Sequence, residues 1–338
     1  MSGPVRVLVT IDTEEDDWGT YRTQGNSVAN IALLPELVPL WERFGVRPTY
    51  FVNYPPMVSP EASDVLRSLA RDTRCEMGVH CHPWNTPPLR EVVGRPPTMM
   101  NGLSDEENFA KLSVLTSLFE ERFGSRPRSF RAGRWGFGAT VARPLHRLGY
   151  QVDSSVSPLL DWSRSGGPDY SQAADAPYCF DPDEPFVPVK EGALVELPAS
   201  IGFLWGPRGS SATLRAALEG SFLARYRVVG LLDSIGLFAR RWLSPETTRD
   251  GEMARLARRL VGSGATVLDL TFHSSALLPG ATPFVRSEAD REKFVERIET
   301  FLQFCVRKGF SFSTASEVAG AFRRGRLGHC LESESAVS

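Results

Sequence analysis

The sequence predicts an α/β protein built on a parallel sheet. Short β-type runs alternate with longer segments of helical period along the 338 residues, and this alternation is typical of parallel sheets, either open or closed into a barrel. Hydrophobic residues make up 42% and charged residues 23% of the chain, a balance that excludes a disordered or fibrous protein. The length allows two domains, but α/β barrels of this size often form a single one.

The elements of the first half follow from apolar runs and from helix-ending signals. Val5–Ile11 is an apolar run typical of a buried strand. Asp105–Phe123 is a strong helix prediction, because Ser104 suits the N-cap, acidic residues fill the first turn and Gly124 follows the last turn. The other expected elements are helix Ile31–Phe44, strand Arg47–Val52, helix Glu61–Ala70, strand Glu76–His80, strand Ser129–Arg131, helix Ala139–Leu148 and strand Tyr150–Asp153.

Two segments interrupt the alternation in the second half. Segment 161–189 carries five prolines and a Gly-Gly pair, which predicts a long loop of the kind that often carries function. Segment 212–243 has a helical pattern rich in aromatic residues and arginine, and we expect helices packed on the sheet rather than a membrane-surface helix. We expect one folded domain over 1–325 and a flexible tail over 326–338. The other expected elements are strands Ala193–Leu197 and Thr266–Thr271, helix Ser287–Arg307 and a strand–helix pair within Phe310–Arg323.

Charge and cysteine usage narrow the class of protein further. A formal net charge of −2 and a pI near 6.3 argue against a general nucleic-acid-binding surface, which needs excess positive charge. The five cysteines form no closely spaced framework, which favours reduced thiols in a cytosolic protein. No apolar stretch approaches the ~20 residues that cross a bilayer, and the first residues lack the basic region of a signal peptide. The sequence therefore predicts a cytoplasmic protein without nucleic-acid partners.

Polar residues gather where the expected strands end. Asp12 and Glu14 follow the first strand, and His80 and His82 follow the third. Each pair is spaced i, i+2, so on extended backbone both side chains of a pair point to the same side. His273 ends a later strand. The carboxyl ends of strands are the face on which α/β barrels assemble active sites, so we expect these five residues to meet there.

Two imidazoles and a carboxylate are a normal ligand set for a catalytic Zn²⁺. The same set matches the facial triad of non-haem Fe(II) oxygenases, although those usually have an all-β scaffold. A structural Zn²⁺ bound by Cys75, Cys81 and the histidines is a third reading. It is disfavoured because Cys81 and its neighbouring histidines point in opposite directions on an extended segment.

Five segments in order resemble the motifs of the polysaccharide deacetylase family, the NodB-homology group of metal-dependent carbohydrate esterases. The resemblance covers about residues 5–322 and depends on the order and strand context of the set. The sequence is similar to a divergent branch, because two motifs depart from the family's usual spacing. Thr13 separates Asp12 from Glu14, and only Cys81 separates the two histidines. The segments are TIDTE (Thr10–Glu14), EMGVHCHPW (Glu76–Trp84), FRAGRWG (Phe130–Gly136), YQVDSSVSP (Tyr150–Pro158) and LTFHSS (Leu270–Ser275).

The resemblance implies a distorted (β/α) barrel of the NodB type, with about seven strands. It also implies a hydrolase that removes N-acetyl groups from amino sugars in a glycan or glycan precursor. In that reading Glu14, His80 and His82 hold a divalent metal, expected to be Zn²⁺, and the assignment of base and ligand between Asp12 and Glu14 stays open. The expected catalytic residues are Asp12 as base, Arg131 steadying it, and His273 as general acid, with a backbone N–H near Ala132 or Gly133 facing the oxyanion.

Four further residues beside the motifs are expected on the substrate side. Aromatic faces suit the apolar faces of sugar rings, which favours Trp84 and Trp135. Arg134 is expected to meet a substrate carboxylate or phosphate, and Asp153 lies in the fourth motif. Two other readings stay open: a related hydrolase of cyclic amides or ureides with the same fold, and a non-catalytic glycan-binding descendant.

Overall fold

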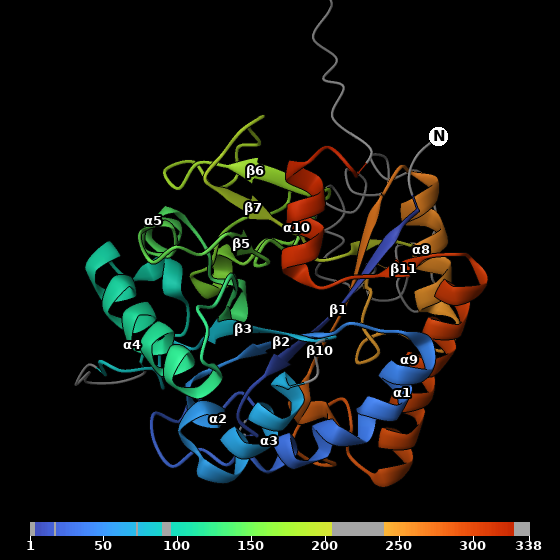
Figure 1. Ribbon diagram of the computed structural model, residues 1–338, viewed down its shortest axis with the longest axis horizontal. Coiled ribbons are helices and arrows are strands. Elements are labelled where there is room, and N and C mark those ends of the chain that lie inside the picture. Colours follow the sequence, from blue (N-terminus) through green and yellow to red (C-terminus); the bar gives the residue numbers. More distant parts are fainter. Residues whose placement is uncertain (1–3, 17, 72–73, 90–95, 205–239, 328–338) are drawn as a thin grey trace, which may run out of the picture.

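The computed structural model describes residues 4–16, 18–71, 74–89, 96–204 and 240–327. Their main feature is one curled sheet in the order β10-β1-β2-β3-β4-β5-β7-β6 (Figure 1). All neighbours in this path pair in parallel except β6, which runs antiparallel to β7. The strands are β10 (Val267–His273), β1 (Arg6–Thr13), β2 (Thr49–Val52), β3 (Glu76–Cys81), β4 (Ser129–Ala132), β5 (Val152–Asp153), β7 (Leu194–Glu196) and β6 (Tyr178–Phe180).

This arrangement confirms the predicted distorted α/β barrel. Seven strands of the described path are parallel, as the sequence predicted, and β11 (Ser311–Phe312) pairs with the start of β1. A separate antiparallel pair is formed by β8 (Ile201–Phe203) and β9 (Arg240–Trp242). Its ends are tied to the main sheet, because Leu243 N donates to the Ser200 carbonyl and Thr271 N donates to the Leu243 carbonyl.

Helices surround the curled sheet (Figure 1). α4 has the ends that the sequence predicted, with Ser104 and Glu107 in a capping box and Gly124 at φ 68° after the last turn. None of the described helices is long and apolar enough to cross a membrane. The described α-helices are α1 (Val38–Phe44), α2 (Tyr54–Val58), α3 (Pro60–Ala70), α4 (Asp105–Phe123), α5 (Ala139–Arg147), α8 (Glu252–Gly262), α9 (Glu288–Arg307) and α10 (Ala315–Arg323).

Three of the expected segments differ in the structure, which also has α2, β8 and α8 where no element was expected. The single helix predicted over Ile31–Phe44 is a 3₁₀ helix over Ala29–Leu37 followed by α1, because Pro35 cannot donate an intrahelical hydrogen bond. The loop predicted over 161–189 contains β6, which pairs with β7.

The third departure lies at the end of the predicted helical segment 212–243. Residues 205–239 lie outside the described part of the chain, as do residues 328–338 of the predicted tail. Residues 240–242 form β9, where a helix was expected. Pairing with β8 outweighs the local helical pattern here, since Ile201 lies opposite Trp242 and Trp242 packs on Trp135.

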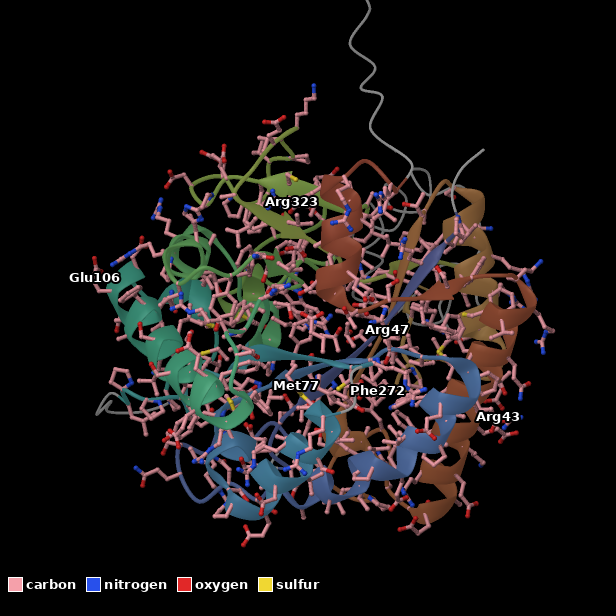
Figure 2. All side chains as sticks on the ribbon, viewed as in Figure 1. Arg43, Arg47, Met77, Glu106, Phe272 and Arg323 are labelled. Carbon is pink, nitrogen blue, oxygen red and sulfur yellow. The ribbon has the colours of Figure 1, made fainter. Side chains whose placement is uncertain are left out.

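Alternate residues of β1 explain why a polar site forms at its end. Val7, Val9 and Ile11 pack into the main core, which includes residues of the surrounding helices. Leu8 faces the opposite side and packs with α10. The same side carries Asp12 four residues later, so the inner face changes from apolar to charged toward the carboxyl end of the strand. Figure 2 shows side chains filling the interior between sheet and helices.

Candidate metal centre

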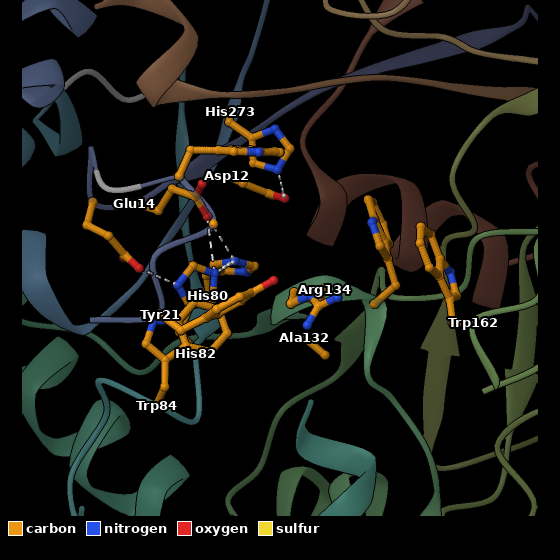
Figure 3. Close-up of a pocket in the computed structure, with 14 residues that line it drawn as sticks. Asp12, Glu14, Tyr21, His80, His82, Trp84, Ala132, Arg134, Trp162 and His273 are labelled. Carbon is orange, nitrogen blue, oxygen red and sulfur yellow. Dashed lines mark hydrogen bonds and ion pairs between the residues drawn. The ribbon is translucent and has the colours of Figure 1, made fainter. Parts of the chain in front are cut away.

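The predicted residues meet at the carboxyl ends of neighbouring strands. Asp12 in β1 lies directly beside His273 in β10, and His80 in β3 lies beside Arg131 in β4. Asp12, His80 and His273 border a cavity of about 290 Å³ (Figure 3). The cavity is lined by Asp12, Glu14, Glu15, Trp18, Gly19, Tyr21, His80, His82, Trp84, Ala132, Arg134, Trp135, Trp162 and His273.

Glu14, His80 and His82 converge as a metal-ligating set would. The Glu14 Oε2 atom lies 3.2 Å from His82 Nε2 and 3.6 Å from His80 Nε2, and the two Nε2 atoms are 3.0 Å apart. All three residues are buried, and one ligand atom from each falls within 4.8 Å of the others. Figure 3 shows the Glu14 carboxylate above the two imidazoles. The structure thus brings together the three residues that the sequence predicted as metal ligands.

The other nitrogen of each imidazole already has an acceptor. His80 Nδ1 lies 2.9 Å from the Arg131 carbonyl oxygen, and His82 Nδ1 lies 2.9 Å from Glu15 Oε1. Protons on both Nδ1 atoms leave the Nε2 lone pairs directed at the shared point. Ligating histidines are usually fixed in this way by a carbonyl or carboxylate, so the donor set fits a divalent cation.

Glu15 is a member of the site that the sequence analysis did not identify. An acidic run normally indicates a solvated loop, but Glu15 is 6% exposed. Its carboxylate accepts from Asn53 Nδ2 at 2.6 Å besides contacting His82. Burial lowers the pKa of His82, but the charges of Glu15 and Glu14 outweigh that effect and raise it to about 10, so a cation would have to displace a proton from Nε2.

Asp12 is held as an anion by a buried arginine. Arg131 is fully buried, and its Nη1 donates to Asp12 Oδ1 at 2.9 Å. Its Nη2 lies 3.0 Å from Asp269 Oδ2. Burial raises the pKa of Asp12, but the positive charge of Arg131, the largest opposing effect, and that of His273 help to outweigh burial, so the pKa lies below its usual range. The predicted contact between Arg131 and Asp12 is therefore present.

A second unpredicted carboxylate orients His273. The Glu246 carboxylate lies 3.0 Å from His273 Nδ1 and accepts the His273 backbone N–H at 2.8 Å. The other ring nitrogen, Nε2, lies 3.8 Å from Asp12 Oδ2. Burial lowers the pKa of His273, and the charges of Glu246 and Glu14 more than offset this and raise it to about 10.

The predicted substrate-side residues separate into two groups. Trp84, Arg134 and Trp135 all line the cavity. Asp153 does not: it is fully buried, its carboxylate accepts from Ser155, and it lies beside Glu196 on the neighbouring strand. The prediction that Asp153 contacts the substrate is therefore wrong: its side chain is buried in the protein and does not reach the cavity.

Two serines of the fourth motif hydrogen-bond to Arg131 and to the Ala132 N–H, which was one of the two expected oxyanion donors. The Ser154 carbonyl and hydroxyl oxygens accept from Arg131. The Ser155 hydroxyl accepts from Ala132 N at 2.8 Å. The Ala132 N–H is thus already bonded and is not available to an oxyanion.

No protein-family model matches the sequence, and no curated protein matches it. Among solved structures, a Mycobacterium smegmatis protein assigned to the polysaccharide deacetylases superposes with a TM-score of 0.53 at 17% identity, covering 99% of this chain and 96% of that chain. The chain has the polysaccharide deacetylase fold. The family resemblance seen in the motifs is therefore confirmed at the level of fold.

Two other structures with the polysaccharide deacetylase fold are similar at lower TM-scores. A Bacillus anthracis protein described as a CE4 family pseudoenzyme gives a TM-score of 0.45 at 12% identity, over 94% of this chain and 66% of that chain. A Bordetella bronchiseptica protein assigned to the polysaccharide deacetylases of O-antigen biosynthesis gives 0.42 at 14% identity, over 88% of this chain and 91% of that chain.

Both departures from the motifs of the polysaccharide deacetylases are accommodated without disturbing the ligand set. Thr13 turns away and donates to the Ile11 carbonyl. Cys81 is fully buried in the main core, where burial raises the pKa of its thiol to about 12. Because both intervening side chains point away, Glu14, His80 and His82 still face one point.

Proposed function

We propose that the protein is a metal-dependent hydrolase that removes an N-acetyl group from an amino sugar in a glycan or glycan precursor. The observation that carries this proposal is the meeting, at one cavity, of a buried Glu/His/His set, an arginine-bound aspartate and a carboxylate-bound histidine. In the proposed reaction they act as metal site, base and acid, and hydrolysis of an acetamide by an activated water molecule uses all three.

The proposed metal is Zn²⁺, held by Glu14, His80 and His82. Two imidazoles and one carboxylate form a three-ligand set that leaves positions for water and substrate. A divalent cation bound there supplies Lewis acidity, which polarises a carbonyl group and lowers the pKa of a water molecule from 15.7 to about 7.

Asp12 and His273 would divide the proton transfers. Asp12 is ionised because its pKa is low, so it accepts the proton of the water that attacks the acetamide carbon. His273 carries a proton at neutral pH, since its pKa is raised, and donates it to the departing amine. Arg131 is a positioning residue that keeps Asp12 ionised and fixed.

Glu15→Gln tests whether Glu15 supports the metal site through His82. We expect the affinity for Zn²⁺ to fall by roughly 10- to 100-fold, the usual effect of altering a partner behind a ligating histidine. Competition with a chromogenic chelator measures this. Glu61→Gln, a change of the same kind in the first turn of α3, is the control. Equal affinities in Glu15→Gln and the control would contradict the role of Glu15.

Glu246→Gln tests whether Glu246 sets the pKa of His273. Removing the negative charge lowers that pKa, so His273 loses its proton at a lower pH. The alkaline limb of the kcat profile is therefore expected to move to lower pH by roughly 1 unit or more. Glu299→Gln, which alters a surface pair with Arg43, should leave the limb in place. An unmoved limb in Glu246→Gln would show that His273 is not the acid.

Acetate release from a panel of N-acetylated sugars tests the proposed reaction itself. Zn²⁺-loaded protein is expected to release acetate from at least one amino sugar and to leave cyclic ureides and imides intact. Hydrolysis of a cyclic substrate without acetate release would favour the related amidohydrolase. Sugar binding with no hydrolysis of any kind would favour a glycan-binding protein.

A further inference from the structure

Strained backbone concentrates on one wall of the cavity. Among the described residues, four residues other than glycine have a positive φ: Tyr21 (53°), Arg134 (53°), Trp135 (62°) and Leu159 (68°). The first three line the cavity, and Leu159 packs with Trp135 in one apolar cluster. Such conformations persist where the surroundings impose them, and they cluster at functional sites. Arg134 and Trp135 are thus held in an unfavourable backbone conformation at the cavity wall.

The charge of Arg134 is not neutralised by any carboxylate in the described part of the chain. Its Nη1 donates to the Thr98 hydroxyl at 2.6 Å, and its guanidinium carbon lies 5.1 Å from the centre of the Tyr21 ring. Both partners are neutral. A guanidinium has five N–H donors, so most of its donor capacity is left for another group. Arg131 differs in this respect, because it is paired with Asp12 and Asp269.

Two sets of packing contacts connect Arg134 to His82 of the candidate metal site. Gly133, its neighbour, packs so tightly on His82 that a Cβ there would clash with the ring. On the other side, Tyr21 packs on Trp84 at 5.0 Å, and Trp84 stacks on His82 at 4.0 Å. Figure 3 shows Arg134 between these rings and Trp162. Arg134 is the one lysine or arginine among the lining residues of the described cavity.

We propose that Arg134, positioned by Thr98 and Tyr21, binds an anionic group of the substrate, a phosphate or a carboxylate carried near the acetamide. The substrate class is then an acidic N-acetylated sugar, and this inference rests on the proposed function. Arginine suits the task because its planar fork makes paired hydrogen bonds to carboxylate and phosphate oxygens. The tryptophans beside it offer faces to the sugar ring.

Equilibrium binding to Zn²⁺-loaded Asp12→Asn protein tests the proposal, because the loss of the base prevents turnover. The probes are N-acetylglucosamine, its 1-phosphate and its uronic acid. We expect at least one acidic probe to bind roughly 10- to 100-fold more tightly than the neutral sugar, as charge-assisted hydrogen bonds imply. The acidic probe that binds more tightly distinguishes a phosphate-linked sugar from an acidic sugar.

Arg134→Gly in the same background should abolish the preference for the acidic probe. Glycine accepts φ 53° without strain, so the melting temperature should not fall. Arg164→Gln removes an exposed charge two residues from Trp162 and should keep the preference. Equal binding of acidic and neutral probes, or a preference that survives Arg134→Gly, would overturn the proposal. Acetate release is a separate readout: an acid-preferring protein that never releases acetate would refute the deacetylase and keep the anion subsite.

Discussion

Asp12→Asn is expected to lower kcat for acetate release by roughly 10²- to 10⁴-fold, the usual contribution of a general base. Asparagine keeps the shape of the side chain and an oxygen that accepts from Arg131, but it cannot take a proton from water. Asp12 is not one of the three converging ligands, so Zn²⁺ should still bind at one ion per chain. The measurement pairs steady-state kinetics with metal analysis of the same sample.

The control for this prediction is Asp64→Asn, which removes an exposed carboxylate of α3. It should leave kcat within about twofold, as surface changes usually have small effects. If Asp12→Asn retained kcat within a few-fold of the wild type, Asp12 would not be the base. If it lost the metal as well as activity, Asp12 would be a ligand, and Glu14 would become the candidate base.

Arg131→Met is expected to destabilise the protein by about 3–5 kcal/mol, the usual cost of removing one partner of a buried ion pair. Arg131 is fully buried, and its loss strips the compensating charge from two carboxylates, Asp12 and Asp269. Urea unfolding at pH 7 measures the change in the free energy of unfolding. Adding Asp269→Asn to the variant should recover part of the loss, because one uncompensated buried charge is removed.

The sign of the pH dependence gives this prediction a second test. In the wild type the folded pKa of Asp12 is lowered, so its contribution to stability is present at neutral pH and lost as the pH falls through that pKa. Without Arg131 the pKa of Asp12 rises, and the difference between variant and wild type should shrink in acid.

Arg126→Met is the matched control, since Arg126 pairs with Glu120 at the surface. It is expected to cost at most about 1 kcal/mol. An equal loss of stability in Arg131→Met and Arg126→Met would contradict the role of the buried pair.

The strand-end residues could be predicted because parallel strands bring their carboxyl ends to one edge. Asp12, His80 and His273 each follow or end a recognisable strand, so their meeting required only the order of strands in the sheet. The i, i+2 spacing of Asp12 and Glu14 also correctly predicted a shared side. The inward direction of both side chains follows from the period of an extended chain.

Glu15 and Glu246 could not be predicted in the same way. Glu15 sits in an acidic run whose local signal is that of a solvated loop, and only the approach of Asn53 and His82 from β2 and β3 buries it. Glu246 follows β9, and its contact with His273 depends on how that segment joins β10. Both contacts come from distant segments that carry no matching sequence signal. For the same reason β9 was expected as part of a helix.

The central claim is that a metal held by Glu14, His80 and His82 makes this protein a deacetylase. The most direct measurement is acetate release by protein stripped with a chelator and then titrated with Zn²⁺, for the wild type and for Glu14→Gln. The account predicts that activity returns to the wild type in proportion to Zn²⁺ and saturates at one ion per chain, while Glu14→Gln needs far more Zn²⁺ to respond. Two results would contradict it: acetate release by the wild type after the chelator has removed the metal, or recovery of activity in Glu14→Gln at the same Zn²⁺ concentration as in the wild type.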